Sequence, residues 1–190
     1  MRFPRFSAWS AIALLGMLAV GVPTAGAWTG MGPKWPTNTN KYDKSALPSN
    51  WQPVADFSAL QWTNVTPSPY TWVSDNSSSN DLTRGNIDGA GRTLAVTTIY
   101  YSGTRITRFT MKFDTSENWY LGSGTPGSGQ IDGRSVGTHE FGHAHGQGHA
   151  QSQYCSGSGS STMCAYYTTG TTFMRSLETD DRNGINTLYP

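Results

Sequence analysis

The sequence has few charged residues, few cysteines and only one long apolar run. Charged side chains make up 13% of the 190 residues, and the formal net charge is +1. Binding to nucleic acid by neutralising phosphates needs a clustered basic surface, whereas the lysines and arginines here are scattered along the chain. We therefore expect no nucleic-acid partner. Aromatic residues, at 12%, can fill the core of one ordinary domain, which argues against a disordered chain.

The single apolar run lies at the N-terminus and is short for a helix that spans a bilayer. It extends from Ala8 to Val22, follows two arginines and precedes Ala25-Gly26-Ala27, which fits the cleavage pattern of a secretory signal peptide. An uncleaved membrane anchor is the alternative. Residues 1–27 are thus a predicted signal peptide, and residues 28–190 a single domain. We expect a secreted, extracellular monomer without membrane contact after cleavage.

The only two cysteines are Cys155 and Cys164. Outside the cytosol two thiols at this separation tend to form a disulfide, which is our prediction. Two cysteine ligands without a second pair do not make a structural zinc site. No cysteine precedes them that could block an active site from a propeptide.

Strand patterns dominate the first half of the domain, and helix patterns follow. Segments 94–101 and 105–113 are rich in β-formers and are separated by the turn Ser102-Gly103. A helix is predicted within 47–62, starting near Pro48, with its buried side formed by Val54, Phe57, Leu60 and Ala55. A strand is predicted at 70–73, and further helices at 132–147 and 179–188. This layout predicts an α+β fold.

The residues suited to chemistry lie in one run from His139 to His149, HEFGHAHGQGH. His139 and His143 are four residues apart, so on a helix their imidazoles project from one face. Gly146 can adopt a positive φ where the chain leaves the helix, and the turn can bring His149 back as a third ligand. Three imidazoles leave one position of a tetrahedral zinc open for water, which is typical of a catalytic site.

Glu140 lies next to the first of these ligands and points about 100° around the helix, near the metal without binding it. Zinc would lower the pKa of water and polarise a substrate carbonyl. Glu140 would then accept the water proton as general base and pass it to the leaving amine. This predicts hydrolysis of a peptide bond, although the spacing alone excludes no other amide. His145 faces another direction, and we expect no metal role for it.

The extended histidine motif followed by a methionine resembles the metzincin metallopeptidases, and within them the matrixins. The resemblance implies that His139, His143 and His149 bind zinc, that Glu140 is the base, and that Met163 lies in the Met-turn beneath the metal. It also implies a metzincin-like catalytic domain: a mixed twisted β-sheet with a helix in the N-terminal half, an active-site helix and a C-terminal helix. An ordinary buried methionine is the alternative for Met163.

The tail LETDDRNGINTLYP is similar to the C-terminal helix of matrixins, whose paired acids help to anchor the Met-turn. Those acids would be Asp180 and Asp181 here. Upstream, IDGAGRTLAVTT resembles the matrixin glycine loop and the edge strand that pairs with substrate, which implies this role for Leu94 and Ala95.

The resemblance further implies a structural calcium ion, bound by oxygen atoms of the glycine loop and of the segment FDTSENW. The alternative is an ordinary turn at Asp88-Gly89 with a solvated Glu117. The implied calcium ligands are Asp88, Gly89, Gly91, Asp114 and Glu117.

Several positions depart from the matrixin pattern. Val96 and Lys112 stand where matrixins have histidines that bind a structural zinc, so we expect that zinc to be absent. His145 and Gln147 replace leucines, which leaves the packing of the third-ligand turn open. In astacins and serralysins a tyrosine lies two residues after the Met-turn methionine, where this chain has Ala165.

Together these patterns predict a secreted zinc-dependent endopeptidase that acts on a protein or peptide substrate. One alternative is a zinc hydrolase that acts on another class of substrate. The other is a catalytically weak or inactive binding module on the same scaffold. Aromatic residues that the sequence does not assign to the core motivate this last alternative: Trp28, Trp35, Trp51 and Tyr70.

Overall fold

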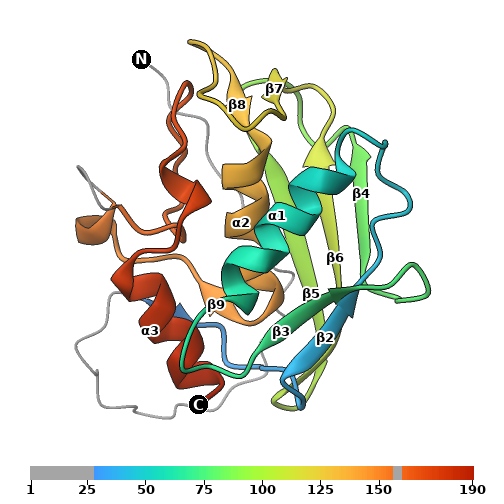
Figure 1. Ribbon diagram of the computed structural model, residues 1–190, viewed down its shortest axis with the longest axis vertical. Helices are drawn as coiled ribbons and strands as arrows, with labels where there is room; N and C mark the ends of the chain where they lie inside the picture. Colours follow the sequence, from blue (N-terminus) through green and yellow to red (C-terminus); the bar gives the residue numbers. More distant parts are fainter. Residues whose placement is uncertain (1–27, 156–159) are drawn as a thin grey trace.

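The computed structural model of this protein describes residues 28–155 and 160–190 (Figure 1). The predicted signal peptide, residues 1–27, and most of the glycine- and serine-rich segment 156–161 lie outside the described residues. No helix in the described part has the length and apolar character needed to cross a membrane.

The largest sheet of the described chain has three strands in the order β4–β6–β5. Strand β4 (Asp81–Gly85) runs parallel to β6 (Arg105–Asp114), while β5 (Ala95–Ser102) is antiparallel to β6 and lies at the edge. The turn between β5 and β6 contains Gly103 at a φ of 58°, as a tight hairpin requires. The predicted strands at 94–101 and 105–113 are confirmed to within one residue.

Shorter strands form three pairs, so the strands are distributed over several small sheets. Strand β3 overlaps the predicted strand at 70–73, whereas the four strands of two residues are too short for an alternating pattern to reveal them. The pairs are β2 (Thr39–Tyr42) with β3 (Thr71–Ser74), parallel; β1 (Thr29–Gly30) with β9 (Gln147–Gly148), antiparallel; and β7 (Trp119–Tyr120) with β8 (Ile131–Asp132), parallel.

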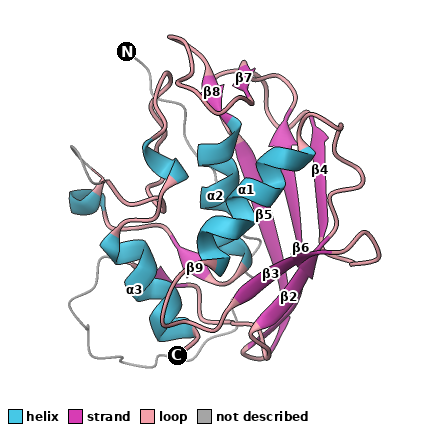
Figure 2. Cartoon of the chain, viewed as in Figure 1, coloured by secondary structure: helices cyan, strands magenta, loops and turns pink. Residues whose placement is uncertain are grey.

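Three α-helices accompany these sheets in the described residues: α1 (Gln52–Thr63), α2 (Gly133–Ala144) and α3 (Thr179–Leu188). Helix α2 packs on β5, and α1 packs on α2 and β3, so both helices cover one face of the sheet (Figure 2). Helix α3 has the predicted bounds and lies apart from the sheet, near β1 and β9. The predicted α+β class is confirmed.

The sequence pattern misplaced the start of α1 and part of its buried side, although Val54 and Ala55 are buried as predicted. The helix begins at Gln52 and not near Pro48, and Leu60 is 50% exposed. The reason is the close approach of α1 to α2, because a Cβ atom at Gly137 would lie only 2.5 Å from the Oγ atom of Ser58. Only a face of mostly small residues permits this approach. The buried residues are Val54, Ala55, Ser58, Ala59 and Trp62.

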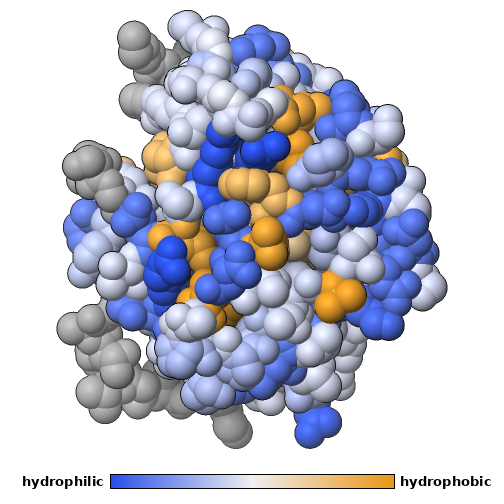
Figure 3. Space-filling model, viewed as in Figure 1, coloured by the Kyte–Doolittle hydropathy of each residue, from blue (hydrophilic) through white to orange (hydrophobic). Residues whose placement is uncertain are grey.

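Three of the four aromatic residues that motivated a binding module belong to the core. Trp35, Trp51 and Tyr70 are 7%, 2% and 0% exposed, and only Trp28 is half-buried. On the described part of the face in Figure 3, apolar groups occur as small areas between polar ones. The structure therefore offers no aromatic platform at these positions.

Candidate metal centre

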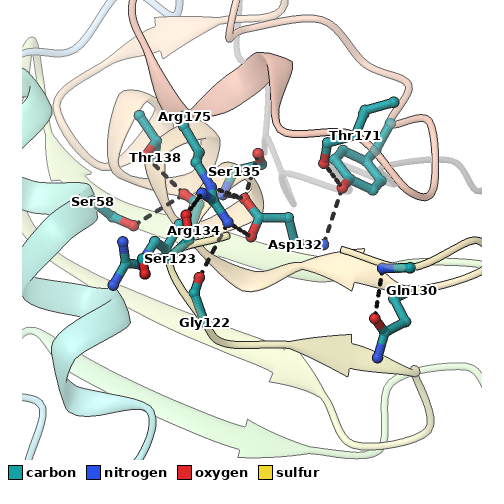
Figure 4. Close-up of polar contacts among 12 residues, drawn as sticks. Ser58, Gly122, Ser123, Gln130, Asp132, Arg134, Ser135, Thr138, Thr171 and Arg175 are labelled. Carbon is teal, nitrogen blue, oxygen red and sulfur yellow. Dashed lines mark hydrogen bonds and ion pairs between the residues drawn. The ribbon is translucent and has the colours of Figure 1, made fainter. Parts of the chain in front are cut away.

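The start of α2 is held by a buried polar network around Asp132 (Figure 4). Its carboxylate accepts hydrogen bonds from the main-chain N and the Oγ of Ser135, at 2.9 and 2.7 Å, which caps the helix. The guanidinium of Arg175 binds both carboxylate oxygens, at 2.8 and 2.6 Å, and also donates to the carbonyls of Gly122 and Ser123. The network thus ties the helix to the segment that follows the Met-turn.

The end of α2 is set by Gly146, so the helix ends at Ala144 and not at Gln147 as predicted. Gly146 has a φ of 104°, and a Cβ atom there would lie 2.7 Å from the carbonyl oxygen of Pro33. Any other residue would be strained at this position. Two aromatic side chains bind the last carbonyls of the helix: Trp35 Nε1 donates to Ala144 O at 2.8 Å, and Tyr189 Oη donates to His145 O at 2.7 Å.

This turn brings the three predicted zinc ligands together. One nitrogen of each imidazole of His139, His143 and His149 lies within 4.8 Å of the others, and the Nε2 atoms of His143 and His149 are 3.2 Å apart. Two ligand atoms of a tetrahedral zinc with bonds of 2.0–2.1 Å lie about 3.3 Å apart. The separation of the His143 and His149 nitrogens therefore suits one zinc ion, and the three imidazoles form a group that could hold it.

Main-chain carbonyls orient the two imidazoles on α2. His139 Nδ1 lies 2.7 Å from Thr162 O, and His143 Nδ1 lies 2.8 Å from Gln147 O. Because a carbonyl only accepts, each Nδ1 carries the proton, and each Nε2 is left with the lone pair that a metal needs. The donor set therefore fits zinc by chemistry as well as by spacing.

Burial keeps these imidazoles neutral. It is the largest cause that lowers the pKa of His143 to about 3, and the neighbouring His149 lowers this pKa further. Burial, with the charges of the other two rings, also holds the pKa of His139 well below its ordinary value. The pKa of His149 is lowered by burial alone. Neutral imidazoles are the form that binds zinc, so the site needs no proton loss at pH 7.

Glu140 lies on α2 beside these ligands and is 1% exposed. Burial raises the pKa of its carboxyl to about 7, although hydrogen bonding from Thr97 opposes the rise. Thr97 reaches the helix from the edge strand β5, and its Oγ1 donates to Glu140 O at 3.2 Å. A carboxyl that titrates near neutral pH can both accept and return a proton. The sequence did not indicate Thr97, because this contact joins two distant segments.

Met163 is fully buried under α2. A Cβ atom at Gly142 would lie 2.2 Å from its Sδ atom, so the methionine packs directly on the helix that carries His139 and His143. The carboxylate of Asp181 holds the Met163 turn, because it accepts from Thr162 N at 2.8 Å and from Met163 N at 3.2 Å. Of the two acids expected to share this task, Asp180 instead accepts from Trp28 N at 2.8 Å.

The predicted disulfide between Cys155 and Cys164 is confirmed, with an S–S distance of 2.09 Å. Cys164 directly follows the Met-turn methionine, so the bridge ties that turn to the short 3₁₀ turn Ser152–Tyr154. Tyr166, two residues further on, is 51% exposed.

The N-terminal segment clamps the third-ligand turn, a contact that the sequence did not indicate. Strand β1 pairs with β9, Thr29 Oγ1 donates to His149 O at 2.8 Å, and Met31 N donates to Gly146 O at 2.9 Å. Such pairing depends on segments more than a hundred residues apart.

The predicted calcium ligands gather in one place, around the loop between β4 and β5. Asp114, which is fully buried, accepts from the main-chain N atoms of Ile87 and Asp88, at 3.2 and 3.3 Å. Glu117 accepts from Gly91 N at 2.7 Å. The carboxylates thus bind the loop itself. Gly89 and Gly91 adopt positive φ values of 90° and 75°.

Val96 and Lys112 face each other in the register of β5 and β6. They line a shallow cavity of about 300 Å³ with Asn86, Ile87, Thr98 and Thr110.

Three converging imidazoles beside a buried carboxyl form a group able to hold a metal ion, as the catalytic site of a zinc hydrolase requires. The matrixin family, Peptidase_M10, matches residues 44–190, and the chain belongs to this family of zinc metallopeptidases. The predicted resemblance is thereby confirmed. No curated protein matches the chain.

Proposed function

We propose that this protein is a secreted endopeptidase that hydrolyses peptide bonds with zinc and with Glu140 as the general base. The observation that carries the proposal is the placement of a buried carboxyl, with a pKa of about 7, directly beside three convergent neutral imidazoles. Bound zinc supplies a Lewis acid that lowers the pKa of water and polarises the scissile carbonyl. Glu140 takes the water proton and delivers it to the leaving nitrogen.

Substrate binding is assigned to the edge strand. Within the described residues β5 pairs with β6 alone, so the main-chain groups on its other side are available to an extended peptide. The side chains of Leu94 and Ala95 are buried at 0% and 2%, which anchors the strand while its backbone stays at the sheet edge. Backbone pairing of this kind gives affinity without a strict demand on side chains.

Export with cleavage before Trp28 is also part of the proposal. Trp28 N lies 2.8 Å from the Oδ1 atom of Asp180. After cleavage this nitrogen would be a charged ammonium group, and its bond to the carboxylate would become a charge-assisted one. The position of Trp28 therefore suits a mature N-terminus.

The last component of the proposed function is a structural calcium ion at the glycine loop. Burial raises the pKa of Glu117, and the negative charges of Asp114 and Asp88 raise it further. A cation among these oxygen ligands would relieve that repulsion, and carboxylates with carbonyls are what Ca²⁺ prefers.

The decisive test replaces Glu140 with Gln. We expect the variant to bind one zinc per chain, as the wild type does, and to cleave casein about 10²–10⁴-fold more slowly, because the ligands remain while the base is lost. Wild-type cleavage should stop with a zinc chelator and return with added zinc. Equal rates in wild type and variant would contradict the role of Glu140. A wild type that binds zinc but cleaves no protein would favour a hydrolase for another substrate.

A further inference from the structure

The third-ligand turn contains a buried polar pair, His145 and Gln147, where apolar packing would be expected. Both side chains are 0% exposed. His145 Nε2 lies 2.7 Å from Gln147 Oε1, and Gln147 Nε2 donates to Asp181 O at 3.2 Å. Because the carbonyl of Asp181 can only accept, the amide must point its nitrogen there and its oxygen to His145, which therefore donates from Nε2. The orientation of the glutamine is fully determined.

Helix α3 leaves space for this amide. A Cβ atom at Gly184 would lie 2.0 Å from Gln147 Nε2 and 2.7 Å from its Cδ atom. Glycine in a helix interior is destabilising relative to alanine. The chain thus carries an unfavourable residue in α3 at the position where the glutamine enters.

The same glutamine contacts the metal centre through its main chain. Gln147 O accepts from His143 Nδ1 at 2.8 Å, while the equivalent partner of His139 is Thr162 O. Asp181 holds the residues that carry both carbonyls. Its carboxylate accepts from Thr162 N at 2.8 Å, and its main-chain oxygen accepts from the side-chain Nε2 of Gln147. One residue of α3 therefore fixes the two carbonyls that orient the two imidazoles of α2.

We propose that Gln147 is a positioning residue of the metal centre: its side chain, oriented by His145 and anchored on Asp181, holds the carbonyl that orients His143. The inference rests on the zinc site of the proposed function. Strand β1 already holds the opposite side of this turn through the pairing of Gly30 with Gln147. The glutamine side chain supplies the second attachment, on α3. A leucine would fill the space but would leave the donor of His145 and the acceptor of Asp181 unpaired.

The experiment measures the zinc dissociation constant, by chelator competition, and the visible absorption of the cobalt-substituted protein. Changes in groups that orient metal ligands typically weaken metal affinity about 10–100-fold, and we expect this loss for Gln147→Leu together with an altered cobalt spectrum. The control is Asn80→Leu. Asn80 is another buried amide that bridges main-chain groups, Lys41 O and Phe109 N, outside the site. The Asn80→Leu variant should have a lower melting temperature and an unchanged zinc affinity.

Two further variants separate positioning from stability. His145→Leu combined with Gln147→Leu removes the unpaired imidazole donor, so we expect melting temperature to recover in part while zinc affinity stays low. Recovery of both together would indicate a merely structural role and overturn the proposal. Gly184→Ala carries the test if Gln147→Leu does not fold: alanine should favour the helix, yet it should weaken zinc binding by displacing the amide.

Wild-type zinc affinity and an unchanged cobalt spectrum in Gln147→Leu, or in Gly184→Ala when that variant carries the test, would also overturn the proposal. That outcome leaves the proposed function intact, because the wild type still binds zinc. A wild-type protein that binds no zinc would instead overturn both.

Discussion

The turn at residues 144–149 and the glycine loop at residues 86–93 both bring polar groups of distant segments together, but they use those groups differently. Beside the turn, the main-chain carbonyls of Thr162 and Gln147 accept hydrogen bonds from Nδ1 of His139 and His143. The other ring nitrogens of these histidines converge with one of His149. In the glycine loop, Asp114 and Glu117 accept hydrogen bonds from loop N–H groups. The turn therefore presents nitrogen atoms that can bind a metal. In the loop, by contrast, the carboxylates are already hydrogen-bonded to the N–H groups of the loop itself.

The pKa values of the acids show the same contrast. At Glu140 burial prevails and raises the pKa to about 7. At Asp114 burial also raises the pKa, but hydrogen bonds from Ser116, Asp88 and Ile87 outweigh it and lower the pKa overall. A buried carboxyl with little hydrogen bonding is available for proton transfer, while one served by several N–H groups stays ionised and structural. The two regions thus differ in the number of hydrogen-bond donors that their buried carboxylates receive: few at Glu140 and several at Asp114.

The largest effect is expected for His149→Ala. An open catalytic site has no spare protein ligand, so zinc affinity should fall by more than roughly a thousandfold, beyond the 10–100-fold typical of groups that only orient ligands. Chelator competition measures it. Stoichiometric zinc at unchanged affinity would show that another group is the third ligand. The turn at residues 144–149 would then not present a metal ligand of its own, which contradicts the comparison with the loop.

A smaller effect concerns the metal-free protein. The folded pKa of Glu140, about 7, exceeds its ordinary value of 4.5, so the folded state binds more protons between these values and stability falls as pH rises through this window. Glu140→Gln removes that cost. In urea unfolding with chelator present, we expect the variant to gain on the order of 3 kcal/mol over wild type above pH 7 and almost nothing at pH 4. An equal difference at both pH values would contradict the raised pKa.

The smallest effect is expected in the glycine loop. If calcium binds there, adding it at about ten times its dissociation constant should stabilise the zinc-loaded protein by about 1.4 kcal/mol. Asp114→Ala should abolish the rise in melting temperature. Asp75 is the matched control, because it also caps a loop, through Ser77 N at 2.9 Å. Asp75→Ala should leave the calcium response unchanged. A wild type that does not respond to millimolar calcium would mean that the loop is complete without the ion.

The sequence predicted the features that depend on local spacing. His139 and His143 lie on one helix, and Gly146 ends that helix, so short-range geometry is sufficient to anticipate the histidine cluster. Strands β5 and β6 were predicted because each is long and rich in β-formers, and helix α3 because Asp180 and Asp181 stand where a helix start favours acids. The buried side of α1 was only partly right. Val54 and Ala55 are buried, but Leu60 is exposed because the partner surface at Gly137 selects small residues, and no pattern within α1 contains that information.

What the sequence by itself determined is the set of residues able to bind a metal and the helix that presents two of them, because a helix converts a spacing of four residues into one face. Only the tertiary structure decided which groups orient those ligands. The contacts of Asp132 with Arg175, of Trp28 with Asp180 and of Gln147 with Asp181 join residues 43, 152 and 34 positions apart. Such pairs form only after the core has brought the segments together, since closing long loops must be offset by burial elsewhere.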